Sequence, residues 1–79
     1  MSQRDKLIAR IRRRPPQAAF SDVEQLLELF GWTCTRTRGS HRAFTTPGQR
    51  TLIVPIKEGK VARVYLDQIC DRLGLDEED

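Results

Sequence analysis

The chain has 79 residues, of which 38% are hydrophobic and 32% are charged, and its formal net charge is +3. A chain of this length and composition forms one folded domain with a single small core, which excludes a disordered segment and leaves no room for a deep cofactor cleft. It has no stretch of the roughly 20 consecutive apolar residues that a membrane span needs and no secretion signal at its start, so we expect a cytoplasmic protein.

Two helices are predicted in the first part of the chain. Residues 3–14 place Leu7, Ile8 and Ile11 on one side of a helix that Pro15 and Pro16 end. The second helix has a stronger pattern. Ser21 and Glu24 have the form of a capping box at its start, and Gly31 stands where a helix usually ends. Its buried face is formed by residues at helical spacing, namely Val23, Leu26, Leu27 and Phe30.

Three strands are predicted next. In the first, residues 32–37, Trp32, Cys34 and Arg36 alternate with threonines, so we expect these three side chains to share one face. Arg38, Gly39 and Ser40 form a tight turn into a strand over residues 41–46. Pro47 and Gly48 turn the chain into residues 50–55, where Leu52, Ile53 and Val54 indicate a well-buried strand.

A third helix follows a loop of residues 57–59. Its apolar positions have helical spacing, and Gly74 ends it; they are Tyr65, Leu66, Ile69, Cys70 and Leu73. The order α-α-β-β-β-α predicts an α+β fold in which helices cover one face of a three-stranded antiparallel sheet. The other face of the sheet is then open to solvent or to a partner.

Charge is segregated along the sequence. No acidic residue occurs between Glu28 and Glu58. That segment contains the basic residues Arg36, Arg38, Arg42, Arg50 and Lys57, together with His41. A second basic cluster comprises Arg10, Arg12, Arg13 and Arg14, and the chain ends in an acidic tail, residues 76–79. This distribution favours a polyanionic partner such as RNA, although an ordinary charged surface can also contain an acid-free segment.

His41 is the only histidine in the chain and the candidate catalytic residue. An imidazole can accept and donate a proton near neutral pH, so it can deprotonate a ribose 2′-hydroxyl for attack on the adjacent phosphorus. Arginines at positions 36, 38 and 42 can bind phosphate oxygens, and Gly39 can let a phosphate approach the backbone. DNA lacks this internal nucleophile, so the constellation favours RNA. The alternative is that His41 is an ordinary turn residue.

The sequence gives less support to a metal-dependent nuclease, to a serine nucleophile and to base stacking by Trp32 or Phe44. No paired carboxylates accompany His41 in the basic segment, so we expect no metal ions and no other cofactor. Ser40 lacks a separate His/Asp relay for nucleophilic catalysis. Trp32 and Phe44 are predicted to pack in the core rather than to stack on bases, and Cys34 and Cys70 are expected to be free thiols.

An ordered set of motifs resembles the HicA family of toxins from type II toxin–antitoxin systems. The resemblance covers residues 20–75. The motifs are the segment Leu27 to Trp32, the run Arg38 to Phe44, Val54-Pro55, Ile69, and Leu73 to Leu75. Two features depart from the common pattern: Arg42 stands where a second histidine is frequent, and residues 1–16 form a helical extension similar to that of a longer subgroup.

The resemblance implies a dsRBD-like fold, meaning one like the double-stranded-RNA-binding domain, and metal-independent cleavage of mRNA. It also implies a HicB-type antitoxin that covers the active site, with a possible oligomer in the toxin–antitoxin complex. The family's catalytic histidine corresponds to His41, and its glycine and serine correspond to Gly39 and Ser40. The predicted RNA-binding residues are Arg36, Arg38, Gly39, Ser40, Arg42, Arg50 and Lys57. A noncatalytic RNA-binding module and a protein–protein adaptor are the alternatives.

Overall fold

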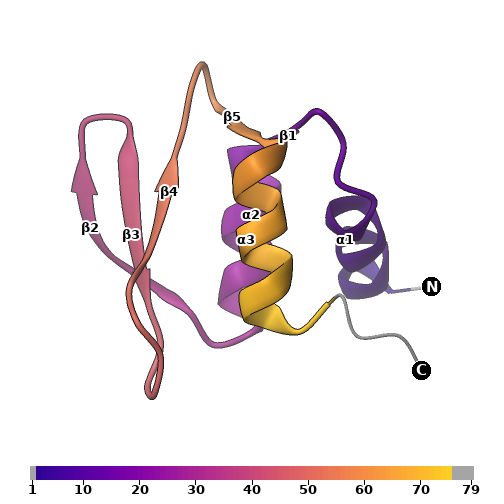
Figure 1. The fold of residues 1–79 in the computed structure, drawn as a ribbon. Coiled ribbons are helices and arrows are strands. Elements are labelled where there is room, and N and C mark those ends of the chain that lie inside the picture. Colours follow the sequence, from indigo (N-terminus) through magenta and orange to yellow (C-terminus); the bar gives the residue numbers. More distant parts are fainter. Residues whose placement is uncertain (1, 76–79) are drawn as a thin grey trace.

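The computed structural model describes residues 2–75, which form three layers (Figure 1). The sheet β2-β3-β4 is the first layer, helices α2 and α3 cover one of its faces, and α1 packs on the far side of these helices. The predicted α+β class and the predicted sheet are confirmed. The described elements are α1 (Gln3–Arg12), β1 (Gln17–Ala19), α2 (Phe20–Leu29), β2 (Thr33–Arg38), β3 (His41–Thr45), β4 (Leu52–Pro55), β5 (Lys60–Ala62) and α3 (Arg63–Leu73).

The three-stranded sheet is antiparallel, with β3 as its central strand. His41, the first residue of β3, lies opposite Arg38 of β2 on one side and Pro55 of β4 on the other. Ala43 likewise lies between Arg36 and Ile53. Because residues directly opposite one another project from the same face of a sheet, these side chains share one face.

The expectation that Trp32, Cys34 and Arg36 share a face is wrong for Arg36. The register of β2 against β3 shifts between Cys34, which lies opposite Phe44, and Arg36, which lies opposite Ala43. Such a shift adds one residue to β2 and reverses the alternation of its side chains beyond that point. Arg36 therefore lies on the open face of the sheet, while Trp32 and Phe44 are buried on the side of the helices as predicted.

A second, two-stranded sheet lies where the two central helices begin. Ala18 of β1 pairs with Val61 of β5, and both side chains are buried. The backbone N–H of Phe20 donates to the carbonyl of Gly59 (2.8 Å), and the backbone N–H of Arg63 donates to the carbonyl of Pro16 (3.1 Å). The predicted capping box at Ser21 and Glu24 is wrong, because α2 starts at Phe20 with no side-chain cap and leads directly out of β1.

The core extends from the sheet through the helices to α1. Leu7 and Ile11 of α1 are buried, so the N-terminal extension packs on the rest of the domain. In β4, Leu52 and Val54 are buried, but Ile53 is 46% exposed, so only alternate residues of that strand face the core. The prediction of a well-buried strand is therefore wrong for Ile53.

The helix ends and the thiols agree with the sequence-based expectations. Gly31 follows α2, where the N–H of Trp32 donates to the carbonyl of Leu27 (2.9 Å), and Gly74 is the C-cap of α3. Cys34 and Cys70 are not joined in a disulfide. None of the helices within residues 2–75 has the length and apolar character needed to cross a membrane. The predicted acidic tail, residues 76–79, lies outside the described residues.

Candidate functional site

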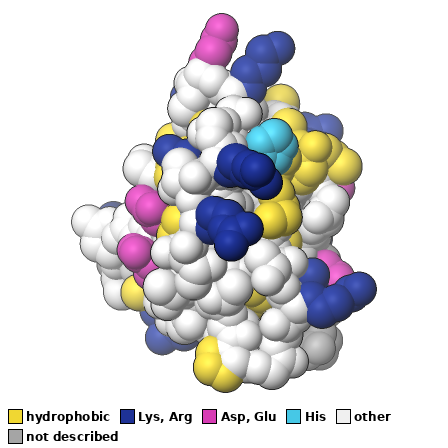
Figure 2. All heavy atoms as spheres, turned by 90° about the vertical axis from the view of Figure 1, so that its left-hand side faces the viewer, with side chains coloured by type: hydrophobic (Ala, Val, Ile, Leu, Met, Phe, Trp, Pro, Cys, Tyr) yellow, Lys and Arg dark blue, Asp and Glu magenta, His cyan; other side chains and the backbone are white. Residues whose placement is uncertain are grey.

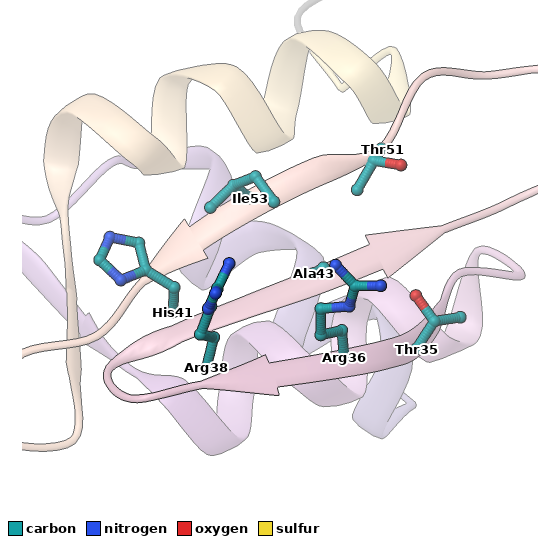
Figure 3. Close-up of a pocket in the computed structure, with 7 residues that line it drawn as sticks. All are labelled: Thr35, Arg36, Arg38, His41, Ala43, Thr51 and Ile53. Atoms are coloured by element: carbon teal, nitrogen blue, oxygen red, sulfur yellow. The ribbon is translucent and has the colours of Figure 1, made fainter.

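The open face of the sheet contains a hollow of about 520 Å³ at the site predicted from the sequence. Figure 3 shows how its side chains lie. Arg36 and Arg38 project from the edge strand β2, His41 stands at one end of the group, and Ile53 lies on β4 across from them. The lining residues are Thr35, Arg36, Arg38, His41, Ala43, Thr51 and Ile53.

A tight turn places His41 beside Arg38. Gly39 and Ser40 connect the two strands, and Gly39 has a φ of +60°, which matches the first central residue of a type II′ hairpin turn. A side chain at Gly39 would meet nothing within 4 Å, so glycine is required there by the backbone conformation and not by space. The turn leaves His41 exposed at the start of β3.

The hollow is positively charged. Its lining contains two arginines and one histidine but no acidic residue. Within residues 2–75, the ion pairs join Arg10 to Asp22 and Arg14 to Asp67, so neither Arg36 nor Arg38 is neutralised by a carboxylate of the domain. In the space-filling view of this side, basic side chains lie next to the single histidine and beside a hydrophobic area (Figure 2). Such a surface can bind an anion such as a phosphate group.

Arg42 does not join this group, because its position in β3 directs it to the opposite face. Its Nη1 donates to the carbonyl of Gly39 (3.3 Å), and its guanidinium lies over the ring of Phe20. Arg42 therefore supports the turn from the side of the helices.

Arg50 and Lys57 also lie outside the hollow. Arg50 precedes β4, at the end of that strand away from Pro55 and His41, and its carbonyl accepts a hydrogen bond from Arg72 (2.8 Å). Lys57 follows β4 and lines a separate hollow together with Ser40. The structure thus brings together Arg36, Arg38 and His41 from the predicted set.

A comparison with protein-family models identifies the family. The model described as "HicA toxin of bacterial toxin-antitoxin" matches residues 20–75. The chain belongs to the HicA toxin family. It is therefore the toxin of a toxin–antitoxin system, and an antitoxin partner follows from the family. Neither the curated proteins nor the solved structures include a match to the chain.

In this HicA toxin, four residues of the hollow were not predicted as site residues: Thr35, Ala43, Thr51 and Ile53. Ala43 could have been found from the alternation of β3, since it stands two residues after His41. Ile53 was assigned to the core because it lies in a continuous apolar run. In the described part of the chain, no three His, Cys, Asp or Glu side chains gather where they could hold a metal ion.

Proposed function

We propose that this HicA toxin is an endoribonuclease that cleaves mRNA in the cytoplasm without a metal ion, with His41 as its catalytic residue. The observation that carries the proposal is a hollow whose lining combines His41 with Arg36 and Arg38 and contains no acidic side chain. An RNA phosphate placed between the two guanidinium groups would bring its ribose close to the imidazole. Gly39 and Ser40 form the turn that connects Arg38 to His41.

The chemistry follows from these positions. Neutral His41 takes the proton of the ribose 2′-hydroxyl, and the 2′-oxygen attacks the adjacent phosphorus. The bond from phosphorus to the 5′-oxygen of the next nucleotide breaks, which leaves a 2′,3′-cyclic phosphate and a 5′-hydroxyl. Arg36 and Arg38 stabilise the negative charge that builds up on the phosphorane, because both guanidinium groups line the same hollow as His41.

The leaving 5′-oxygen must also receive a proton. One histidine cannot stand on both sides of the phosphorus, and the other side chains lining the hollow belong to threonine, arginine, alanine and isoleucine. We assign this proton to water, either free or bound to one of the arginines. General acid–base groups contribute about 10²- to 10⁴-fold each, so the lack of a positioned acid predicts slow turnover.

The antitoxin partner is proposed to be a HicB-type protein that covers the open face. That face combines the basic hollow with the exposed side chain of Ile53, and the free edge of β2 adjoins it. A protein with acidic groups and an apolar contact would exclude RNA from His41. The assembled complex is proposed to be an oligomer of toxin and antitoxin.

The proposal is tested by expressing the chain and its His41→Ala variant in a bacterial host and following growth and the integrity of total mRNA. We expect the native chain to stop growth and degrade mRNA. The variant is expected to be harmless, while its thermal unfolding remains that of the native protein because His41 is exposed. Equal toxicity of both chains, or harmlessness of both, would contradict catalysis by His41.

A noncatalytic RNA-binding module is the second candidate, and the observation that favours it is the single acid–base side chain among the residues lining the hollow. Such a module would keep its RNA affinity and its effect in cells when His41 becomes alanine. The salt dependence of binding distinguishes both of these RNA-binding functions from a protein–protein adaptor. Binding driven by phosphate contacts weakens steeply with ionic strength, whereas binding of a strand or an apolar surface changes little.

A further inference from the structure

A second hollow, also of about 520 Å³, lies on the other side of the turn that carries His41. The two hollows are joined by backbone contacts: the N–H of Ile56 donates to the carbonyl of Ser40 (2.7 Å), and Pro55 pairs with His41. A chain leaving the first hollow past Ser40 therefore reaches the second directly. The lining residues of the second hollow are Ser40, Pro55, Ile56, Lys57, Glu58, Lys60, Ala62 and Tyr65.

Two lysines face each other in this second hollow. Lys57 and Lys60 form a bridge in which each backbone N–H donates to the other's carbonyl at 2.9 Å. Like charges directly opposite each other in a β-pair destabilise it. Within residues 2–75 neither lysine forms an ion pair, and Glu58 is the one acidic residue of the lining. An anion bound between the two ammonium groups would remove their repulsion.

Tyr65 supplies an aromatic surface to the same hollow. It is half-buried in the first turn of α3, so its backbone is fixed by the helix while part of its ring remains accessible. Unpaired nucleic-acid bases stack on accessible aromatic rings, and this contact contributes without regard to base identity. A phosphate-binding pair next to an aromatic ring is the combination that a nucleotide requires.

We propose that the second hollow is a subsite for single-stranded RNA that binds a nucleotide adjoining the one cleaved at His41. Lys57 and Lys60 hold its phosphate, and Tyr65 stacks on its base. The inference rests on the proposed function, because it extends the RNA path of the same site. It requires an unpaired base, so it selects single-stranded regions of a transcript over duplex.

The test measures binding of fluorescent RNA to protein carrying His41→Ala, so that the RNA stays intact. The probes are a single strand of about ten nucleotides and a duplex of the same length. In this background, Lys57→Gln with Lys60→Gln is expected to weaken single-strand binding about tenfold. It is also expected to reduce the slope of log Kd against log salt by about 0.7 for each phosphate that the protein no longer neutralises. Lys6→Gln, which removes an exposed charge from α1, is the control and is expected to leave the affinity for the single strand and the salt slope unchanged.

Tyr65→Leu separates stacking from charge. It is expected to weaken single-strand binding about tenfold without changing the salt slope, and to leave duplex binding unchanged. Thermal unfolding of each variant shows whether the fold is kept, and Tyr65→Phe, which retains the ring, is expected to restore binding. The subsite is overturned if the lysine variant behaves like Lys6→Gln, or if Tyr65→Leu weakens single-strand and duplex binding equally.

Failure of the nuclease assignment can be distinguished from failure of the subsite by comparing RNA cleavage with RNA binding. If these binding changes appear but the native chain cuts no RNA, the subsite stands and the nuclease assignment falls. If the native chain cuts RNA and the lysine and tyrosine variants bind as tightly as their background, the subsite falls and the nuclease assignment stands.

Discussion

The guanidinium carbon of Arg42 lies 5.4 Å from the centre of the Phe20 ring. This contact joins the first residue of α2 to the strand that begins with His41, and the Phe20 ring itself packs at 6.3 Å from that of Phe44. The same guanidinium donates to the carbonyl of Gly39. Arg42 therefore anchors the turn beside His41 to the helix layer, and we interpret it as a positioning residue and not as a phosphate ligand.

Replacing Arg42 by glutamine is expected to loosen the turn. A cation–π contact and a hydrogen bond at a half-buried position together contribute about 1–2 kcal/mol to the free energy of unfolding, which urea denaturation measures. RNA cleavage should fall because His41 is held less well. The salt slope of RNA binding should stay unchanged, because the variant neutralises the same phosphates as the native chain.

Arg38→Gln is the matched variant on the open face. Like Arg42→Gln, it removes one positive charge, but this charge lies in the hollow. The slope of log Kd against log salt should therefore fall by about 0.7. The free energy of unfolding should change by less than about 0.5 kcal/mol. An equal decrease of the salt slope in the two variants would show that Arg42 also contacts phosphate and would contradict its assignment to the turn.

Gly39→Ala is predicted to affect activity through the backbone alone. Its φ of +60° is strained for alanine, and no atom lies within 4 Å of the added carbon, so the expected cost is about 1 kcal/mol of stability. Gly48→Ala is the control, because Gly48 has a φ of +84° and equally open surroundings in the β3–β4 connection. Both should lower the unfolding midpoint, but only Gly39→Ala should lower RNA cleavage. Equal cleavage by the two variants would show that the turn does not position His41.

The features predicted correctly from the sequence are those set by local patterns. The apolar spacing of α2 and α3, Gly31 after α2 and the turn at Gly39 and Ser40 each depend on residues close together in the chain. The grouping of Arg38 with His41 follows from that turn. It could be predicted because a two-residue connection leaves only one pairing of the strands.

The features missed depend on contacts between distant segments. β1 and β5 have three residues each and stabilise one another, so neither has a pattern of its own. Their pairing also replaces the capping box expected at Ser21, since the Phe20 N–H bonds to Gly59. The register shift after Cys34 moved Arg36 to the open face, and no residue in β2 indicated it because a shift is defined only against β3.

The extension is predicted to be part of the folding unit, although the family match begins at residue 20. Ile11 is fully buried, and Ile11→Ala should lower the free energy of unfolding by about 2–5 kcal/mol in urea denaturation. Ile53→Ala, with the side chain 46% exposed, is the control and should cost less than about 1 kcal/mol. A decrease for Ile11→Ala as small as that expected for Ile53→Ala would mean that α1 does not stabilise the domain.

Ile53 is predicted to distinguish antitoxin binding from general surface effects. Its side chain is 46% exposed in the hollow beside Arg36 and Arg38, whereas Val64, which is 56% exposed, lies on α3. An acidic residue at position 53 would remove the apolar contact and repel the acidic groups of an antitoxin that covers the open face, and it would also repel RNA phosphates. Ile53→Asp should therefore raise the Kd for the antitoxin at least about tenfold and weaken RNA binding, as titration calorimetry and RNA binding measure. Val64→Asp should leave the Kd for the antitoxin unchanged. Loss of antitoxin binding in Val64→Asp alone would place the antitoxin on the helices, away from His41.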